Sequence, residues 1–67
     1  MSETRTYTVT GMTCAHCVAS VTEEVQEIDG VEAVDVLLET GRLTVTASAV
    51  DDAAVRSAVE EAGYQLA

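Results

Sequence analysis

The sequence predicts one α+β domain whose elements follow the order β-α-β-β-α-β. Short segments with apolar residues at every second position alternate with segments of helical periodicity. Glycine stands near the points where the pattern changes. With 67 residues, of which 48% are hydrophobic, the chain can form one small core but has no room for a second. We therefore expect a single domain spanning residues 1–67.

The first half of the chain reads as a strand followed by a helix. The strand is predicted over residues 4–10, where Arg5, Tyr7 and Val9 alternate with threonines. From Ala15 the apolar period changes to spacings of three and four, which is typical of one helix face. The residues on that face are Val18, Val21, Val25 and Ile28. Gly30 is predicted to end the helix, since glycine accepts the left-handed conformation common just past a helix end.

The second half is predicted to begin with a β-hairpin. Its strands cover residues 34–39 and 43–47, with Thr40-Gly41 as the turn. The apolar positions of the two strands are Val34, Val36, Leu38, Leu43, Val45 and Ala47. A second helix begins at Asp51 or Asp52, because either carboxylate can cap the free N–H groups. Its buried face consists of Val55, Ala58, Val59 and Ala62, and a short strand over residues 64–66 follows Gly63.

These elements predict a ferredoxin-like arrangement. Right-handed crossovers place both helices on one face of a four-stranded antiparallel sheet. The other face is open to solvent, which suits its polar residues Thr6, Thr8, Asp35, Thr44 and Thr46. Leu37 also falls on the open face, and a lone exposed leucine is usually unremarkable.

The motif Cys14-Ala15-His16-Cys17 lies where the first strand meets the first helix. A spacing of three brings both cysteines to one side of the first helical turn. At roughly 2.3 Å per metal–sulfur bond, a linear sulfur–metal–sulfur unit spans about 4.6 Å, so the two sulfurs can hold one ion. The positive end of the helix favours thiolate over thiol.

The ligand count favours Cu(I) as the ion. Soft thiolates select Cu(I), zinc or iron–sulfur clusters. A structural zinc site uses four ligands and a cluster normally needs four cysteines, but this chain offers two cysteines and one histidine. Zn(II) and Hg(II) remain alternative ions in vitro. An exposed two-ligand site also admits a partner's thiol, which suits a carrier rather than a store.

Composition excludes several other classes of function. Twelve acidic residues against three basic ones give a net charge of −9, which disfavours binding to nucleic acid. No apolar run reaches the roughly 20 residues of a membrane span, so no membrane insertion is expected. The polar segment at residues 1–5 lacks the apolar core of a signal peptide, and we expect a cytoplasmic protein.

The run GMTCAHC, with a helix directly after it and Ala62-Gly63-Tyr64 near the end, resembles the heavy-metal-associated domain family. Within that family the sequence is most similar to free-standing bacterial and archaeal copper chaperones. The resemblance implies a cytosolic Cu(I) carrier that docks on the metal-binding domain of a copper-transporting P-type ATPase. It also implies that Cys14 and Cys17 are the metal ligands and that Tyr64 lies beside the metal. The chain departs from the family in having no lysine and in its large acidic excess.

Four residues are candidates for supporting the ligands. Met12 is expected to fill the space beneath the loop, since methionine adapts to irregular gaps. Thr13 is expected to act as a local cap or turn residue. His16 is expected to face solvent, because adjacent residues on a helical turn point in different directions. For Tyr64 the alternatives are ordinary strand packing and shielding of the metal.

Several alternatives to a copper chaperone stay open at this stage. They are a detached metal-sensing domain, a mercury-handling module, a small thiol–disulfide oxidoreductase and a regulatory dimer built around shared metal. The apo protein is expected to be monomeric, and a copper-bridged dimer remains open. The lysine-free, carboxylate-rich composition further suggests a halophilic source, with mere solubility as the alternative explanation.

Overall fold

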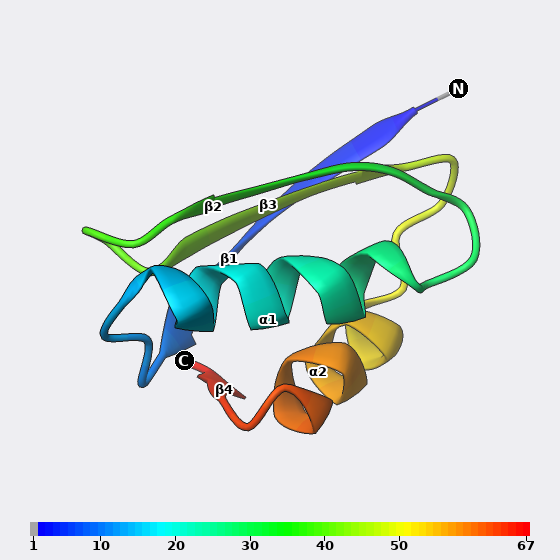
Figure 1. Cartoon of the computed structure of the whole chain (residues 1–67). Helices are drawn as coiled ribbons and strands as arrows, with labels where there is room; N and C mark the ends of the chain where they lie inside the picture. The colour runs from blue at the N-terminus through cyan, green and yellow to red at the C-terminus, as the bar shows by residue number, and fades with distance from the viewer. Residues whose placement is uncertain (1) are drawn as a thin grey trace.

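The computed structural model describes residues 2–67 and confirms the β-α-β-β-α-β order. The elements are β1 (Glu3–Thr10), α1 (Ala15–Gln26), β2 (Val31–Leu37), β3 (Arg42–Ala47), α2 (Asp52–Glu61) and β4 (Gln65–Leu66). The strands form one antiparallel sheet in the order β2-β3-β1-β4. Both helices lie on one face of this sheet (Figure 1). The predicted ferredoxin-like fold is therefore confirmed.

The core lies between the sheet and the two helices. Its buried residues are Val9, Val21, Val25, Leu43, Val45, Ala47, Val55, Ala58 and Val59. The two central strands and both helices contribute to this set, as their periodicity predicts. Within residues 2–67 the structure buries no polar or charged residue. The burial of apolar side chains therefore stabilises this core, and no buried hydrogen-bonded or ionic pair contributes to it.

The second strand differs from its predicted bounds. It begins at Val31 rather than residue 34 and ends at Leu37 rather than residue 39. A shift in the pairing with β3 between Val31 and Ala33 interrupts the period of two, which hides the start of the strand in the sequence pattern. Leu38, which the alternation placed beside Val36, lies in the turn instead and is 39% exposed.

The open face of the sheet is polar, as predicted. Thr4 pairs with Thr46, their hydroxyl oxygens lying 3.2 Å apart, and Thr6 pairs with Thr44. Leu37 is 48% exposed on this face. Of the residues assigned to the opposite face, Arg5 is exposed and reaches Asp52 at 3.5 Å.

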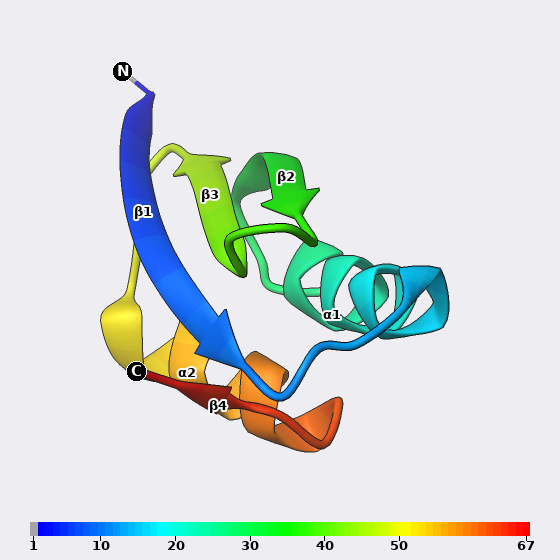
Figure 2. The ribbon, with the colours of Figure 1, turned by 90° about the vertical axis from the view of Figure 1, so that its left-hand side faces the viewer.

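The β2–β3 hairpin is fixed directly to the end of β1. The N–H of Val9 donates to the carbonyl oxygen of Gly41 at 2.7 Å. A Cβ atom on Gly41 would lie only 2.5 Å from the carbonyl oxygen of Val9, and the φ of Gly41 is +71°. Only glycine fits this position without moving the backbone. The hairpin, the β1–α1 loop and the α2–β4 turn therefore share one end of the molecule, which Figure 2 shows facing the viewer.

Candidate metal centre

The loop from Gly11 to Cys14 leads from β1 into α1. Gly11 has a φ of +94°, and a Cβ at this position would lie 3.4 Å from the ring of Tyr64. Cys14 occupies the N-cap position in an extended conformation, and its side chain makes no capping hydrogen bond. Its carbonyl oxygen accepts from the N–H groups of Cys17 and Val18 at 3.1 and 3.4 Å. Both thiols are thus held at the positive end of α1.

The two sulfur atoms lie 3.6 Å apart as free thiols. Cys14 is exposed, whereas Cys17 is half-buried at the start of α1. A linear sulfur–metal–sulfur unit of about 4.6 Å requires them to separate by about 1 Å, which a small rotation of the exposed Cys14 side chain can supply. The donor set and its spacing therefore fit a soft ion bound between two thiolates.

Hydrogen bonds favour the thiolate form of Cys17. The backbone of Thr13, the Tyr64 hydroxyl and the backbone of Cys14, in that order, lower the pKa of Cys17 from 9.0 to about 6. The hydrogen bond between Tyr64 and Cys17 also raises the pKa of Tyr64, because the Tyr64 hydroxyl donates to the Cys17 sulfur. Cys17 is therefore mainly a thiolate at neutral pH and is ready to bind a cation without first losing a proton.

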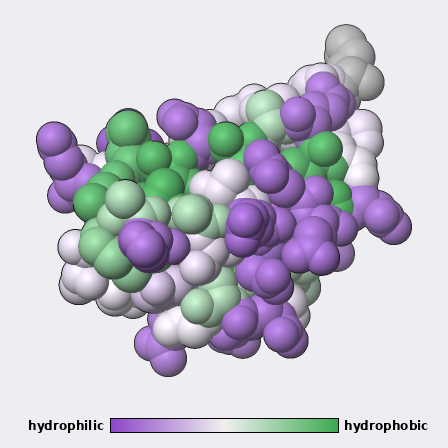
Figure 3. All heavy atoms as spheres, viewed as in Figure 1, coloured by the Kyte–Doolittle hydropathy of each residue, from purple (hydrophilic) through white to green (hydrophobic). Residues whose placement is uncertain are grey.

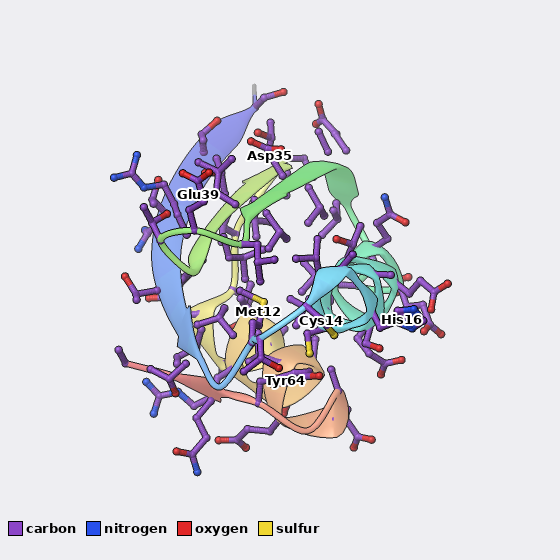
Figure 4. All side chains as sticks on the ribbon, turned by 60° about the vertical axis from the view of Figure 1, so that its left-hand side comes forward. Met12, Cys14, His16, Asp35, Glu39 and Tyr64 are labelled. Atoms are coloured by element: carbon purple, nitrogen blue, oxygen red, sulfur yellow. The ribbon has the colours of Figure 1, made fainter. Side chains whose placement is uncertain are left out.

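The four supporting candidates divide into two groups. Thr13 and Tyr64 face Cys17, and the Thr13 hydroxyl oxygen lies 3.9 Å from its sulfur. Met12 packs against the core beneath the loop. His16 is exposed and points away from the sulfurs (Figure 4). Thr13 is not the N-cap residue, because the helix begins one residue later than a Thr13 cap would require.

Carboxylates do not complete the site. Within residues 2–67, no group of three or more histidine, cysteine, aspartate or glutamate side chains is arranged to hold a metal ion. The candidate centre therefore consists of two sulfurs, a donor number that suits Cu(I) better than a structural zinc ion.

The ionisation of Cys17 gives a testable pH dependence. We expect its alkylation by iodoacetamide to rise with a midpoint near pH 6, three units below the ordinary value of 9.0. The measurement is mass-spectrometric quantification of labelling at Cys17, resolved from Cys14 by fragmentation, across pH 4–10 in the unchanged chain. In a Tyr64→Phe background the midpoint should move upward, because a donor to the thiolate is lost. A midpoint that stays near 9 with Tyr64 intact would contradict this account.

The fold alone does not set the function, but two soft sulfur donors side by side at a strand-to-helix loop suit a small metal-binding domain. The heavy-metal-associated domain model matches residues 6–65. The chain therefore belongs to the heavy-metal-associated domain family. The copper chaperones of this family carry metal rather than catalyse reactions, so the expectation that the chain is not an enzyme is confirmed and the oxidoreductase alternative loses its support.

Individual relatives are similar over nearly the whole chain. A copper chaperone, CopZ, from Bacillus subtilis is 43% identical over 67 residues, with 97% of each chain covered. A solved structure described as a CopZ metallochaperone superposes with a TM-score of 0.91 at 34% identity, covering 97% of this chain and all of the other. A zinc/cadmium/lead-transporting P-type ATPase from Shigella sonnei is 45% identical over 58 residues, which are 87% of this chain and 8% of the ATPase.

Proposed function

We propose that this chain is a cytoplasmic Cu(I) metallochaperone that carries the ion on Cys14 and Cys17 and delivers it to the metal-binding domain of a copper-transporting P-type ATPase. The observation that carries the proposal is the pair of sulfurs 3.6 Å apart at an exposed helix start. The similarity to a copper chaperone over 97% of both chains supports it. So does the spread of the family match over residues 6–65, which fits a single domain of residues 1–67.

The preference for copper follows from the number and softness of the donors. Cu(I) is satisfied by two thiolates, whereas a structural zinc ion takes four ligands. The exposed His16 points away from the sulfurs, so a third donor would have to come from another molecule. Zn(II) and Hg(II) are expected to bind in vitro, but zinc should bind more weakly to a site with two protein ligands.

Delivery is a ligand exchange without redox chemistry. A thiolate of the acceptor forms a bond to the bound Cu(I), which then has three sulfur ligands. One cysteine of this chain leaves as a thiolate, a second acceptor thiolate binds, and the other cysteine follows. Cu(I) keeps its oxidation state throughout; two Cu–S bonds to the acceptor form, two Cu–S bonds to this chain break, and both cysteines of this chain are left as free thiolates. The exposure of Cys14 gives an incoming thiolate access to the metal.

A detached metal-sensing domain is the second candidate function. The similarity to a segment of a metal-transporting ATPase supports this alternative, because the segment covers 87% of this chain. The two functions differ in what happens to the metal after binding. A carrier transfers it completely to a separate domain, whereas a sensor retains it.

An anaerobic titration followed by transfer tests the proposal. The reduced protein is titrated with Cu(I), Zn(II) and Hg(II), then mixed with the metal-binding domain of the copper ATPase encoded in the same genome. We expect one Cu(I) per chain, bound more tightly than Zn(II), and passage of copper to the acceptor within the mixing time. Tight one-to-one binding of Zn(II) in preference to Cu(I), or retention of copper, would overturn the proposal.

A further inference from the structure

One side of β1 is largely unpaired. On its other side β1 pairs with β3 along Glu3–Thr8, but here the two-residue strand β4 covers only the last two residues of β1. One further hydrogen bond joins the chain after β4 to the carbonyl oxygen of Thr8. A hollow of about 320 Å³, which Thr6 lines from β1 and Arg56 from α2, lies beside this side of the strand. We call the unpaired side of residues 2–6 the open edge.

The backbone groups that point toward the open edge follow from two hydrogen bonds. The N–H of Val9 points toward the β3 side, since it donates to Gly41, whereas the carbonyl oxygen of Thr8 points toward β4. Because successive residues of an antiparallel strand turn their backbone groups to alternate sides, Thr4 and Thr6 point outward as Thr8 does. Both residues are exposed. A strand edge with free N–H and C=O groups is a template for pairing with another strand.

The charges along the open edge select one register for two antiparallel copies of it. Thr4 opposite Thr4 of a second copy places Glu3 of each chain opposite Arg5 of the other. A shift by two residues sets Arg5 against Arg5 in one direction and Glu3 against Glu3 in the other. Opposite charges that face each other across two strands are stabilising, whereas like charges are destabilising. The edge is therefore complementary to itself in the register centred on Thr4.

The length of the open edge agrees with this register. With Thr4 at the two-fold axis, Ser2 pairs with Thr6 at either end, so the paired segment occupies residues 2–6. Thr8, whose carbonyl oxygen is already bonded to the chain after β4, lies just outside the paired segment. Each of the residue pairs can exchange two backbone hydrogen bonds, as in any antiparallel ladder.

Glu3 and Arg5 keep free groups for contacts with a second copy. One carboxylate oxygen of Glu3 accepts from the N–H of Val50 at 2.7 Å, which leaves the other oxygen. One nitrogen of Arg5 reaches Asp52 at 3.5 Å, and the guanidinium has further N–H donors. Residues 2–6 carry one acidic and one basic side chain, so the open edge has no net charge. Figure 3 shows hydrophilic side chains gathered instead over the helical side of the molecule.

We propose that the open edge of β1 is a self-association surface, on which two copies of the chain form an antiparallel, two-fold dimer centred on Thr4 without a metal ion. The net charge of −9 on each copy keeps the protein monomeric at low salt. In molar salt, where the Debye length is about 3 Å, this long-range repulsion is screened and the copies pair. The start of β1 lies far from the metal-binding loop (Figure 1), so the dimer leaves both loops accessible.

Two variants of Thr4 test the backbone pairing. Thr4→Pro removes the outward N–H, and it leaves the β1–β3 ladder intact because Thr4 turns its backbone groups away from β3. Thr4→Ala removes the side chain but keeps the N–H, and is the matched control. Sedimentation equilibrium of the reduced, metal-free proteins in molar KCl measures their association constants, and circular dichroism checks that each variant is folded.

We expect the unchanged chain and Thr4→Ala to approach twice the 7.0 kDa mass of one chain as protein concentration rises. Thr4→Pro should associate roughly 10-fold more weakly, because one hydrogen bond from each copy is lost at the two-fold axis. Equal association by folded Thr4→Pro and Thr4→Ala would overturn the inference. So would an unchanged chain that stays monomeric at every KCl concentration.

Charge exchange tests the register. Arg5→Glu sets two carboxylates against each other at both ends of the pair and should weaken association roughly 10-fold. The double variant Glu3→Arg/Arg5→Glu restores opposite charges in reversed order and should recover most of the loss. A folded double variant that associates no better than Arg5→Glu would contradict the register and with it the proposal.

A cysteine variant separates this dimer from one bridged by copper. Cys14→Ser, in the presence of a copper chelator, should associate as the unchanged chain does, because the open edge contains no metal ligand. Association that requires copper or Cys14 would assign the dimer to metal bridging and overturn the inference. Either result leaves the proposed chaperone function standing, since that function depends on copper transfer and not on the open edge.

Discussion

Replacing either Cys14 or Cys17 by serine is expected to abolish functional Cu(I) binding. The candidate centre has two sulfur donors 3.6 Å apart, and within residues 2–67 no cluster of other ligands is available to replace one of them. One thiolate and a hydroxyl do not complete a site for a soft ion. The loss of affinity should exceed the roughly 10- to 100-fold cost of removing a group that only orients a metal ligand. Competition titration against a Cu(I) chelator under reducing conditions measures it.

Stability provides a second readout of the same substitutions. A ligand at 100 times its dissociation constant stabilises the folded state by about 2.7 kcal/mol. For a domain of this size that corresponds to a rise in melting temperature of roughly 10–20 °C. The unchanged chain should show this rise on adding Cu(I) under reducing conditions, and both serine variants should not.

Met12→Leu and His16→Ala are the matched controls. Met12 packs into the core beneath the loop, and His16 points away from the sulfurs, so neither change removes a donor. Both variants should bind Cu(I) within a few-fold of the unchanged chain. X-ray absorption that finds nitrogen or thioether sulfur bonded to the copper would refute the assignment of Cys14 and Cys17 as its sole protein ligands.

The arrangement of the elements could be predicted because the sequence patterns and the packing agree. Val21, Val25, Val55 and Val59 recur at helical spacing, and all four are buried. The same agreement explains why β3 was placed to within one residue. Local and global preferences that coincide in this way are typical of sequences that specify one fold.

The hairpin was predicted less well, for a physical reason. The register shift between Val31 and Ala33 breaks the alternation on which strand prediction depends. At the other end of the strand the cause is different: the alternation of Val34, Val36 and Leu38 continues past the last paired residue, although Leu38 lies exposed in the turn. Sequence alone treats Leu37 as an isolated exposed leucine. The second leucine beside it becomes visible only when the turn geometry is known.

The candidate site shows a similar division between local and distant contacts. The spacing of Cys14 and Cys17 is local and could be predicted from the helical repeat. The contact of Tyr64 with Cys17 joins residues 47 positions apart, and only the family resemblance indicated it. In the structure the Tyr64 hydroxyl stabilises the thiolate form of Cys17. This role differs from shielding a bound metal from solvent.

Salt is expected to stabilise this protein strongly, which would support the proposed halophilic origin. The radius of gyration is 10.6 Å. That is close to the Debye length of about 10 Å at 0.1 M salt and far above the value of about 3 Å at 1 M. Among residues 2–67 the one ion pair, Arg5 with Asp52 at 3.5 Å, joins side chains that are 48% and 64% exposed, so it offsets little of the net charge of −9.

Repulsion is most apparent around Glu24 on α1. Its partial desolvation, followed by the charges of Glu27, Glu61 and Glu23, raises the pKa of Glu24 above its ordinary 4.5. A carboxyl whose pKa is raised on folding favours the folded state when protonated, and this contribution is lost as pH rises through the folded-state pKa. At neutral pH the ionised Glu24 therefore opposes folding, and added salt should relieve the part of that effect that comes from the charges of Glu27, Glu61 and Glu23.

Thermal melts of the reduced apo protein in 0.05–3 M KCl measure the effect. The melting temperature should climb steeply over the first molar, where most of the screening develops, and then more slowly. Glu24→Gln should melt higher than the unchanged chain at low salt and gain less from KCl, because it removes one of the mutually repelling charges. Glu39→Gln makes the same charge change at the hairpin tip, away from Glu27 and Glu61. It should raise the melting temperature at low salt less than Glu24→Gln does, and it should reduce the gain from KCl less. A melting temperature that stays constant across this range would show that water already weakens the repulsion between the carboxylates enough for salt to add nothing. The proposal of a halophilic origin would then fail.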